Sequence, residues 1–225
     1  MTEAIAALPA YAPVRLEEDG ERMYSTPVGK VPSVTTVLSG SRDNSGLELW
    51  RESVGIERAD FIRDLAAHRG TAHHTNIESY LRDGEEPQFN FLTTPYWRST
   101  ETFIKSIRRP LVMEGAIWHP RGFAGTFDCI AYLPEDGDQP TMLDWKTADK
   151  LRTPDKMYDY SLQVAAYVAA ANHVYANYGL NITTAKVVVA LPCQTPQIEH
   201  FDEDALRQLY QHFLARLERF TYYKK

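Results

Sequence analysis

Two strand-like runs that meet at a tight turn, over residues 125–150, constrain the fold of this chain more than any other feature. The turn formers PEDGD separate GTFDCIAYL from TMLDWKT, which is the pattern of a β-hairpin. The first run carries Asp128, and the second carries Asp144 and Lys146, where a core strand would be apolar. Burying such groups is costly unless they are paired or bind a cation. The hairpin therefore has either a solvated face or a functional one.

A mixed sheet is predicted around this hairpin. LVMEGAIWH at 111–119 precedes it as a strand, and AKVVVAL has the β-branched pattern of a strand buried on both faces. The elements after the hairpin are a helix at about 156–178 closed by Gly179, a strand at 185–191, a strand candidate at 197–201 and an amphipathic helix at 202–220. This order predicts an α/β fold with a mixed central sheet flanked by helices.

The first half of the chain is predicted to be mainly helical. Residues 1–20 are rich in Ala, Pro and Glu and are expected to be loose. RMYSTPVGKVPSV predicts a short hairpin, and Ser33 is a candidate cap for the helix after it. Helical patterns follow at 46–81 and 95–108. In the first of them the apolar faces come from Trp50, Val54, Phe61, Ile62 and Leu65, with Gly55 and Gly70 as interruptions.

These patterns predict one domain over 21–225, with a helical part at 33–108 and a core at 110–225. Hydrophobic residues make up 44% of the chain, enough for a substantial core, and no apolar run is long enough to cross a bilayer. The N-terminus lacks a basic segment followed by an apolar one, so a cytoplasmic location is the expectation.

Charge and cysteine content exclude two kinds of function. The net charge of −6 argues against a protein that coats nucleic acid by bulk charge, although an acidic protein can still grip it locally. Cys129 and Cys193 fall inside predicted strands and are interpreted as buried free thiols. Two cysteines cannot supply the four ligands of an iron–sulfur cluster.

The charged residues of the predicted sheet can converge at one place. Side chains alternate along a strand, so Asp144 and Lys146 share one face, with Asp128 on the next strand and Glu114 on the one before it. Carboxylate clusters select hard cations such as Mg²⁺ or Mn²⁺, and a neighbouring lysine suits phosphodiester hydrolysis. The alternative is an exposed cross-strand ion pair, the commoner explanation of an isolated Asp-x-Lys.

Two helical pairs extend this group. His74 and Glu78 are four residues apart and can face one cleft, although periodicity does not choose between His73 and His74. Gln163 and Tyr167 have the same spacing on the helix that follows Lys146. Packing in the core or on the surface is the alternative for each pair.

The ordered series His-x3-Glu, Glu, Gly-x-x-Asp, Asp-x-Lys and Gln-x3-Tyr resembles the PD-(D/E)xK nuclease superfamily, in its RecB-like exonuclease branch. Within that branch, TPVGKVPSVTTVLS and the RGTAHH helix resemble the mitochondrial genome maintenance exonucleases and their phage and bacterial relatives. The resemblance covers about 24–191. It implies a restriction-endonuclease-like core with an N-terminal helical region, in a bacterial or phage-infected cell.

The resemblance assigns roles to particular residues. Asp128 matches the first motif aspartate, although Phe127 stands where many members have proline. Asp144 and Lys146 match the Asp-x-Lys motif, and the carbonyl of Trp145 between them is a further candidate metal ligand.

The same resemblance covers the residues outside the hairpin. It favours His74 over His73 as a metal ligand and adds Glu114 as an acidic one. It assigns Gln163 and Tyr167 to substrate contact or to holding the site. The missing cysteines place the chain outside the iron–sulfur members of the branch.

The expected function is Mg²⁺- or Mn²⁺-dependent exonuclease action on single-stranded DNA ends, reached through an arch of N-terminal helices, in repair, recombination or phage DNA metabolism. Arg98, Lys105 and Arg109 lie among aromatic residues, a composition that suits stacked bases and phosphates as well as a solvated basic helix face. Replication or recombination proteins are candidate partners. The alternatives are an endonuclease on the same core and a non-catalytic DNA-binding recombination accessory protein.

Overall fold

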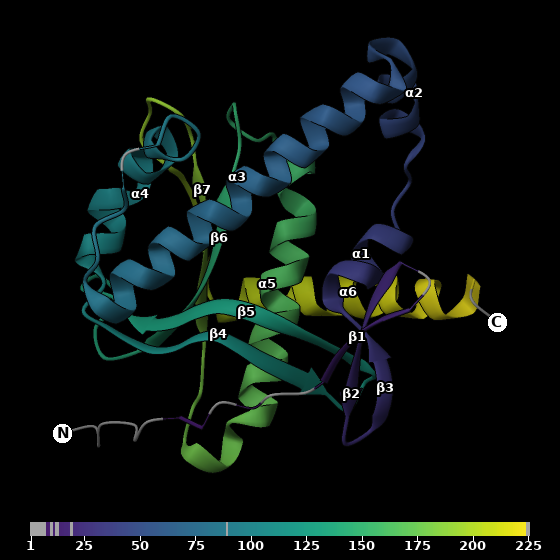
Figure 1. The fold of residues 1–225 in the computed structure, drawn as a ribbon. Coiled ribbons are helices and arrows are strands. Elements are labelled where there is room, and N and C mark those ends of the chain that lie inside the picture. Colours follow the sequence, from purple (N-terminus) through teal and green to yellow (C-terminus); the bar gives the residue numbers. More distant parts are fainter. Residues whose placement is uncertain (1–7, 10, 12–13, 19, 89, 224–225) are drawn as a thin grey trace.

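A five-stranded sheet lies at the centre of the molecule, in the order β4-β5-β6-β7-β8 (Figure 1). The computed structural model describes residues 8–9, 11, 14–18, 20–88 and 90–223. The strands are β4 (Arg109–His119), β5 (Phe123–Tyr132), β6 (Pro140–Thr147), β7 (Thr184–Ala190) and β8 (Gln197–Phe201). β6 and β7 run parallel, and the other neighbouring pairs are antiparallel. The predicted mixed sheet is confirmed.

Helices cover both faces of this sheet. The helices packed on one face are α1 (Val34–Gly40), α5 (Pro154–Val174) and α6 (Glu203–Tyr223), and those on the other are α3 (Ile56–Asp83) and α4 (Thr94–Ser106). Val187 and Val189 of β7 pack in the first layer, and Val188 packs in the second. β7 is therefore buried on both faces, as its apolar run predicts.

A second, three-stranded sheet precedes the core, formed by β1 (Val14–Glu18), β2 (Glu21–Thr26) and β3 (Gly29–Pro32). The predicted hairpin and the cap by Ser33 are confirmed, since the Ser33 hydroxyl accepts from the Thr36 N–H at 2.9 Å. The expectation of a loose segment is wrong for Val14–Glu18, which pairs along its length with β2. Val14 and Leu16 alternate with charged residues in β1, but five residues with mostly exposed side chains give only a weak strand signal.

The helical pattern at 46–81 forms two helices, α2 (Ser45–Val54) and α3, which are separated by Gly55 with φ of 87°. The apolar residues expected to pack there are exposed instead: Trp50, Phe61, Ile62 and Leu65 lie between 39% and 66% exposed. α2 and the first half of α3 project from the sheet (Figure 1). Periodicity predicts an apolar helix face, but it does not say what covers that face.

Two smaller expectations need correction. Cys129 is buried in β5, but Cys193 is exposed, because β7 ends at Ala190 and Pro192 follows. The helix expected at 156–178 ends as α5 at Val174 and continues as the short turn η1 (Ala176–Tyr178), which Gly179 closes at φ of 74°. Among the described residues, no helix is long and apolar enough to span a membrane.

Candidate active site

The site forms where β5 and β6 separate. Their backbone pairing runs from Tyr132–Pro140 to Cys129–Leu143 and stops there. At the next position the Asp128 carboxylate accepts a hydrogen bond from the Trp145 N–H at 2.6 Å. The Asp128 side chain thus takes the place of the β5 backbone as the hydrogen-bond acceptor for β6. The two strands separate at this point, which lies between Asp128 and Asp144.

Glu114 enters the site from β4 through an unusual backbone conformation. Its neighbours Met113 and Gly115 pair with Cys129 and Phe127, so Glu114 lies opposite Asp128. Its φ is +49°, in the left-handed region. That region costs a non-glycine residue about 1–2 kcal/mol, and such outliers cluster at functional sites. The backbone conformation therefore indicates a functional role for Glu114, independently of its charge.

His74 completes a group of three candidate ligands. Its Nε2 lies 2.9 Å from the Trp145 carbonyl oxygen, and its Nδ1 lies 3.4 Å from Asp128 Oδ1. Because a carbonyl oxygen only accepts, Nε2 carries a hydrogen. Burial lowers the pKa of His74, but the Asp128 carboxylate outweighs it and the net shift is upward. When Nδ1 loses its proton, its lone pair faces the site and can bind a cation. Ligand atoms of His74, Glu114 and Asp128 all lie within 4.8 Å of one another.

These donors fit a divalent cation. Two carboxylates and an imidazole are the donor types that Mg²⁺ and Mn²⁺ accept in proteins. Asp144 Oδ2 is buried and forms an ion pair with the Lys146 ammonium, and a carboxylate oxygen keeps a second lone pair beyond this contact. The Trp145 carbonyl is the acceptor of His74 and retains a second lone pair. Both oxygens are therefore available as further donors.

Asp144 links the cation site to α5. Its carboxylate is 0% exposed, forms an ion pair with Lys146 and accepts from Gln163 Nε2 at 3.0 Å. Gln163 Nε2 also lies 3.3 Å from the Tyr167 hydroxyl. A side chain at Gly125 would overlap the Tyr167 ring, with Cβ 2.6 Å from Cε1. The glycine is required there so that Tyr167 can pack against β5.

Tyr160 is a neighbour of the site that the sequence analysis missed. The Lys146 ammonium lies 5.3 Å from the centre of the Tyr160 ring. Tyr160 is three residues before Gln163 on α5, so the two share a helix face. This spacing is the sequence feature that could have predicted Tyr160 as a neighbour of the site.

The site carries shifted proton affinities. Burial raises the pKa of Asp144 to about 6, with Lys146 opposing the shift. Glu114 is exposed at the surface, but partial desolvation of its carboxylate and then the Asp128 charge raise its pKa to about 7. Burial lowers the pKa of Lys146, but the Asp144 and Asp128 carboxylates outweigh it and the net shift is upward. Lys146 is therefore an ammonium at neutral pH, which donates hydrogen bonds rather than accepting a proton.

The structure distinguishes the two adjacent histidines. His73 is fully buried, and neither of its ring nitrogens has a hydrogen-bond partner among the described residues. Burial and then the neighbouring His74 lower the pKa of His73 to about 3. His74 is the histidine of the site.

We expect His73→Leu to stabilise the fold by about 1–3 kcal/mol at pH 7, because it removes an unsatisfied buried polar group. The gain should grow by about 2 kcal/mol at pH 5, because the unfolded histidine protonates below about pH 6.5 and the buried one does not. Urea unfolding at both pH values measures this. His68→Leu, at an exposed position of the same helix, is the control. A less stable His73→Leu variant would show that an unseen partner satisfies the imidazole.

The three basic residues predicted to bind substrate lie elsewhere. Lys105 pairs with Glu86 at 2.8 Å and Glu101 at 2.7 Å. The Arg109 guanidinium lies 4.9 Å from the centre of the Tyr132 ring, which is at the C-terminal end of β5, four residues after Asp128.

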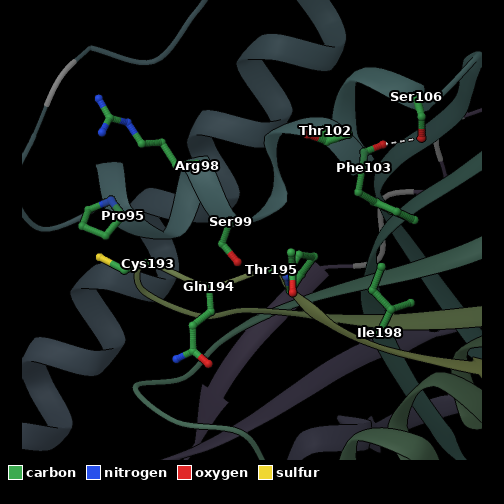
Figure 2. Close-up of a pocket in the computed structure, with 11 residues that line it drawn as sticks. Pro95, Arg98, Ser99, Thr102, Phe103, Ser106, Cys193, Gln194, Thr195 and Ile198 are labelled. Atoms are coloured by element: carbon green, nitrogen blue, oxygen red, sulfur yellow. Dashed lines mark hydrogen bonds between the residues drawn. The ribbon is translucent and has the colours of Figure 1, made fainter.

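Arg98 is the third of these basic residues and lines a groove of about 650 Å³ (Figure 2). The groove lies between α4 and the segment from Cys193 to Ile198, and Phe103 lines it as well. None of the residues around the cation site takes part in its lining. Substrate binding by Arg98, Lys105 and Arg109 stays a prediction.

Comparison with known proteins identifies related chains. The human mitochondrial genome maintenance exonuclease 1 is 30% identical over 208 residues, which cover 87% of this chain and 59% of the human protein. The mouse protein of the same name is 28% identical, over 85% of this chain and 59% of the mouse protein. The chain thus spans less than two thirds of these relatives. The fold was also compared with solved structures. A crystal structure described as an exonuclease from Eubacterium rectale aligns with 70% of this chain and 66% of the bacterial chain, with a TM-score of 0.48 and 15% identity.

A family model also matches most of the chain. The match runs over residues 54–223, from the end of α2 to the end of α6. It includes every residue of the candidate cation site as well as Lys146, Gln163 and Tyr167. With this match and the mixed sheet that carries the site, the chain belongs to the PD-(D/E)XK nuclease superfamily.

Proposed function

We propose that this chain is a Mg²⁺- or Mn²⁺-dependent deoxyribonuclease that removes nucleotides from the ends of single-stranded DNA. The observation that carries the proposal is a three-ligand cation site of His74, Glu114 and Asp128 beside the buried Asp144–Lys146 pair. A cation next to a fixed ammonium suits a phosphate substrate. The exonuclease name of the human and mouse relatives supports action from strand ends.

His74, Glu114 and Asp128 would hold the cation, with Asp144 Oδ2 and the Trp145 carbonyl as further donors. A divalent cation at this place supplies positive charge to a phosphoryl oxygen and lowers the pKa of a bound water. The Asp128 carboxylate also holds the Trp145 N–H, and the His74 ring holds the Trp145 carbonyl. The chain therefore fixes the backbone between Asp144 and Lys146 from both sides.

Lys146 would orient the attacking water and the phosphate. Asp144 and the Tyr160 ring limit the positions of its ammonium. In the reaction the water oxygen bonds to phosphorus in line with the departing oxygen, whose bond to phosphorus breaks. The water loses a proton and the departing oxygen gains one. Gln163 would keep Asp144 in place through its 3.0 Å hydrogen bond.

Single-stranded DNA is favoured by accessible aromatic side chains outside the cation site. Trp50 and Phe61 are exposed on the projecting helices, and Phe103 lines the groove with Arg98. Aromatic rings bind unpaired bases by stacking at about 1–3 kcal/mol per base. The net charge of −6 favours such local contacts over bulk attraction to duplex DNA. Repair, recombination or phage DNA metabolism is the proposed setting, with replication or recombination proteins as candidate partners.

The test uses single-stranded DNA labelled at either end and a closed circular single strand. We expect the linear strands to be degraded with Mg²⁺ or Mn²⁺, the circle to stay intact, and EDTA or Lys146→Ala to stop the reaction. Lys150→Ala, an exposed lysine after the same strand, is the matched control. Cleavage of the circle would instead assign an endonuclease. Binding without any cleavage would assign a DNA-binding accessory protein.

A further inference from the structure

Arg69 is a buried cationic residue that has no role in the proposed reaction. It lies on α3 about one and a half turns before His74 and is 7% exposed. Its guanidinium donates to Asp149 Oδ1 at 2.7 Å and to Thr147 Oγ1 at 3.4 Å, and lies 4.6 Å from the centre of the Tyr96 ring. One side chain thus joins α3, α4 and the segment at the end of β6.

Tyr96 strengthens the same junction from α4. Its hydroxyl donates to Asp149 Oδ1 at 2.7 Å, the oxygen that also accepts from Arg69. Burial and then this hydrogen bond raise the pKa of Tyr96 to about 12, so the hydroxyl stays a donor. The Asp149 side chain is itself 68% exposed. Its position is therefore set by its two donors rather than by burial.

The junction lies directly beside the reactive residues. Thr147 follows Lys146 in β6, and His74 contacts the Trp145 carbonyl two residues earlier. Helix α3 therefore touches the end of β6 at two points, Arg69 and His74, which are about 7.5 Å apart along the helix axis. Two contacts at different places along the axis fix both the position of α3 along its axis and its rotation about that axis, relative to β6.

Arg69 also marks the place where α3 leaves the body of the protein. Before Arg69 the helix buries only Ala59 among its described residues, and α2 buries none. From there α3 continues outward to α2 (Figure 1). Any force that a bound strand exerts on the projecting helices reaches His74 through the turn that holds Arg69.

We infer that Arg69 is a positioning residue, which holds His74 over the end of β6 and so keeps the cation site assembled beside Lys146. The inference rests on the proposed nuclease function, because His74 and Lys146 act in that reaction. A displacement of about 1 Å in a catalytic group can lower a rate about a hundredfold. Arg69 does not touch the reacting atoms, so its loss should affect turnover more than substrate affinity.

Arg69→Gln tests this by steady-state kinetics on end-labelled single-stranded DNA. We expect kcat to fall about a hundredfold with KM within about threefold. Tyr96→Phe should stay within about threefold of wild type in both constants, because Arg69 still holds Asp149. Arg69→Lys should regain part of the lost kcat, since it restores the charge but not the paired donors.

Arg216→Gln is the matched control for a merely structural loss. Arg216 joins α6 to α1 and α5 through Ser41 at 2.7 Å, the Leu38 carbonyl at 2.6 Å and Asp159 at 3.3 Å. Its removal should lower Tm as Arg69→Gln does, while kcat is retained. An Arg69→Gln variant with wild-type kcat, or an equal loss of kcat in Arg216→Gln, would refute the positioning role.

A second measurement does not depend on cleavage. Ring nitrogen NMR in EDTA at alkaline pH should show one His74 tautomer in the wild type, with the hydrogen on Nε2, and mixed tautomers in Arg69→Gln. If the wild type cleaves no DNA, the proposed function fails, and this spectrum alone decides the positioning role. An unchanged His74 spectrum in Arg69→Gln would then overturn it.

Discussion

Asp144→Asn is expected to lower the rate of DNA cleavage about 10³-fold, the scale for losing a preorganised electrostatic group in a buried site. The asparagine keeps an oxygen that accepts from Gln163 but lacks the negative charge at Oδ2 beside Lys146. End-labelled single-stranded DNA with Mg²⁺ or Mn²⁺ measures the effect. Asp138→Asn, at an exposed position of the same hairpin, removes the same charge and should cleave normally.

The same variant should keep or increase the stability of the protein at pH 7 in EDTA. Burial raises the pKa of Asp144 to about 6, above its unfolded value. The stability that the wild-type residue contributes is therefore present at low pH and is lost as the pH rises through about 6. Asparagine does not ionise and has no such loss. The difference in Tm between Asp144→Asn and wild type should therefore increase as the pH rises from about 4 to above about 6. Near-normal cleavage by Asp144→Asn would remove Asp144 from the reaction.

Asp136→Ala should destabilise the fold by about 3 kcal/mol, the lower end for breaking a buried ion pair. Lys186 is 5% exposed in β7 and donates to Asp136 at 2.7 Å and Glu135 at 3.0 Å. Asp136 also accepts from Thr141 at 2.7 Å. The variant would leave the Lys186 ammonium buried with only Glu135, whose side chain is 50% exposed. Urea unfolding at pH 7 measures the loss.

Two further variants separate the buried charge from the shape of the turn. Asp138→Ala, in the same turn but exposed, should change the free energy of unfolding little. Adding Lys186→Met to Asp136→Ala should restore most of the stability, because an apolar side chain of similar length replaces the unpaired ammonium. A urea midpoint for Asp136→Ala equal to that of Asp138→Ala would show that Glu135 alone satisfies Lys186.

The charged hairpin could be predicted because strand alternation is strict. A period of two places Asp144 and Lys146 on one face whatever the rest of the fold does, and the pairing with β5 brings Asp128 to them. His74 could not be chosen over His73 in this way. Adjacent helical residues point about 100° apart, and only the packing of α3 decides which of them is buried.

Other features depend on contacts that no local pattern contains. The positive φ of Glu114 arises within a strand whose sequence shows nothing unusual. Lys186 interrupts an apolar run, and its partners come from the turn before β6. The exposed face of α2 and α3 has the same periodicity as a packed one. For Lys186 the deciding hydrogen bonds join residues 50 and 51 positions apart in the sequence, so no local pattern predicts them.

Trp145 contacts both faces of the sheet, one through its backbone and the other through its side chain. Its N–H and carbonyl serve Asp128 and His74, while its ring packs on the opposite face of the sheet against Phe103. At position 145 the proposed reaction therefore uses only backbone atoms, which every amino acid except proline supplies. The identity of the side chain at this position is set by the volume of the far core, so the residue between two reactive ones can change with the packing and leave the reaction untouched.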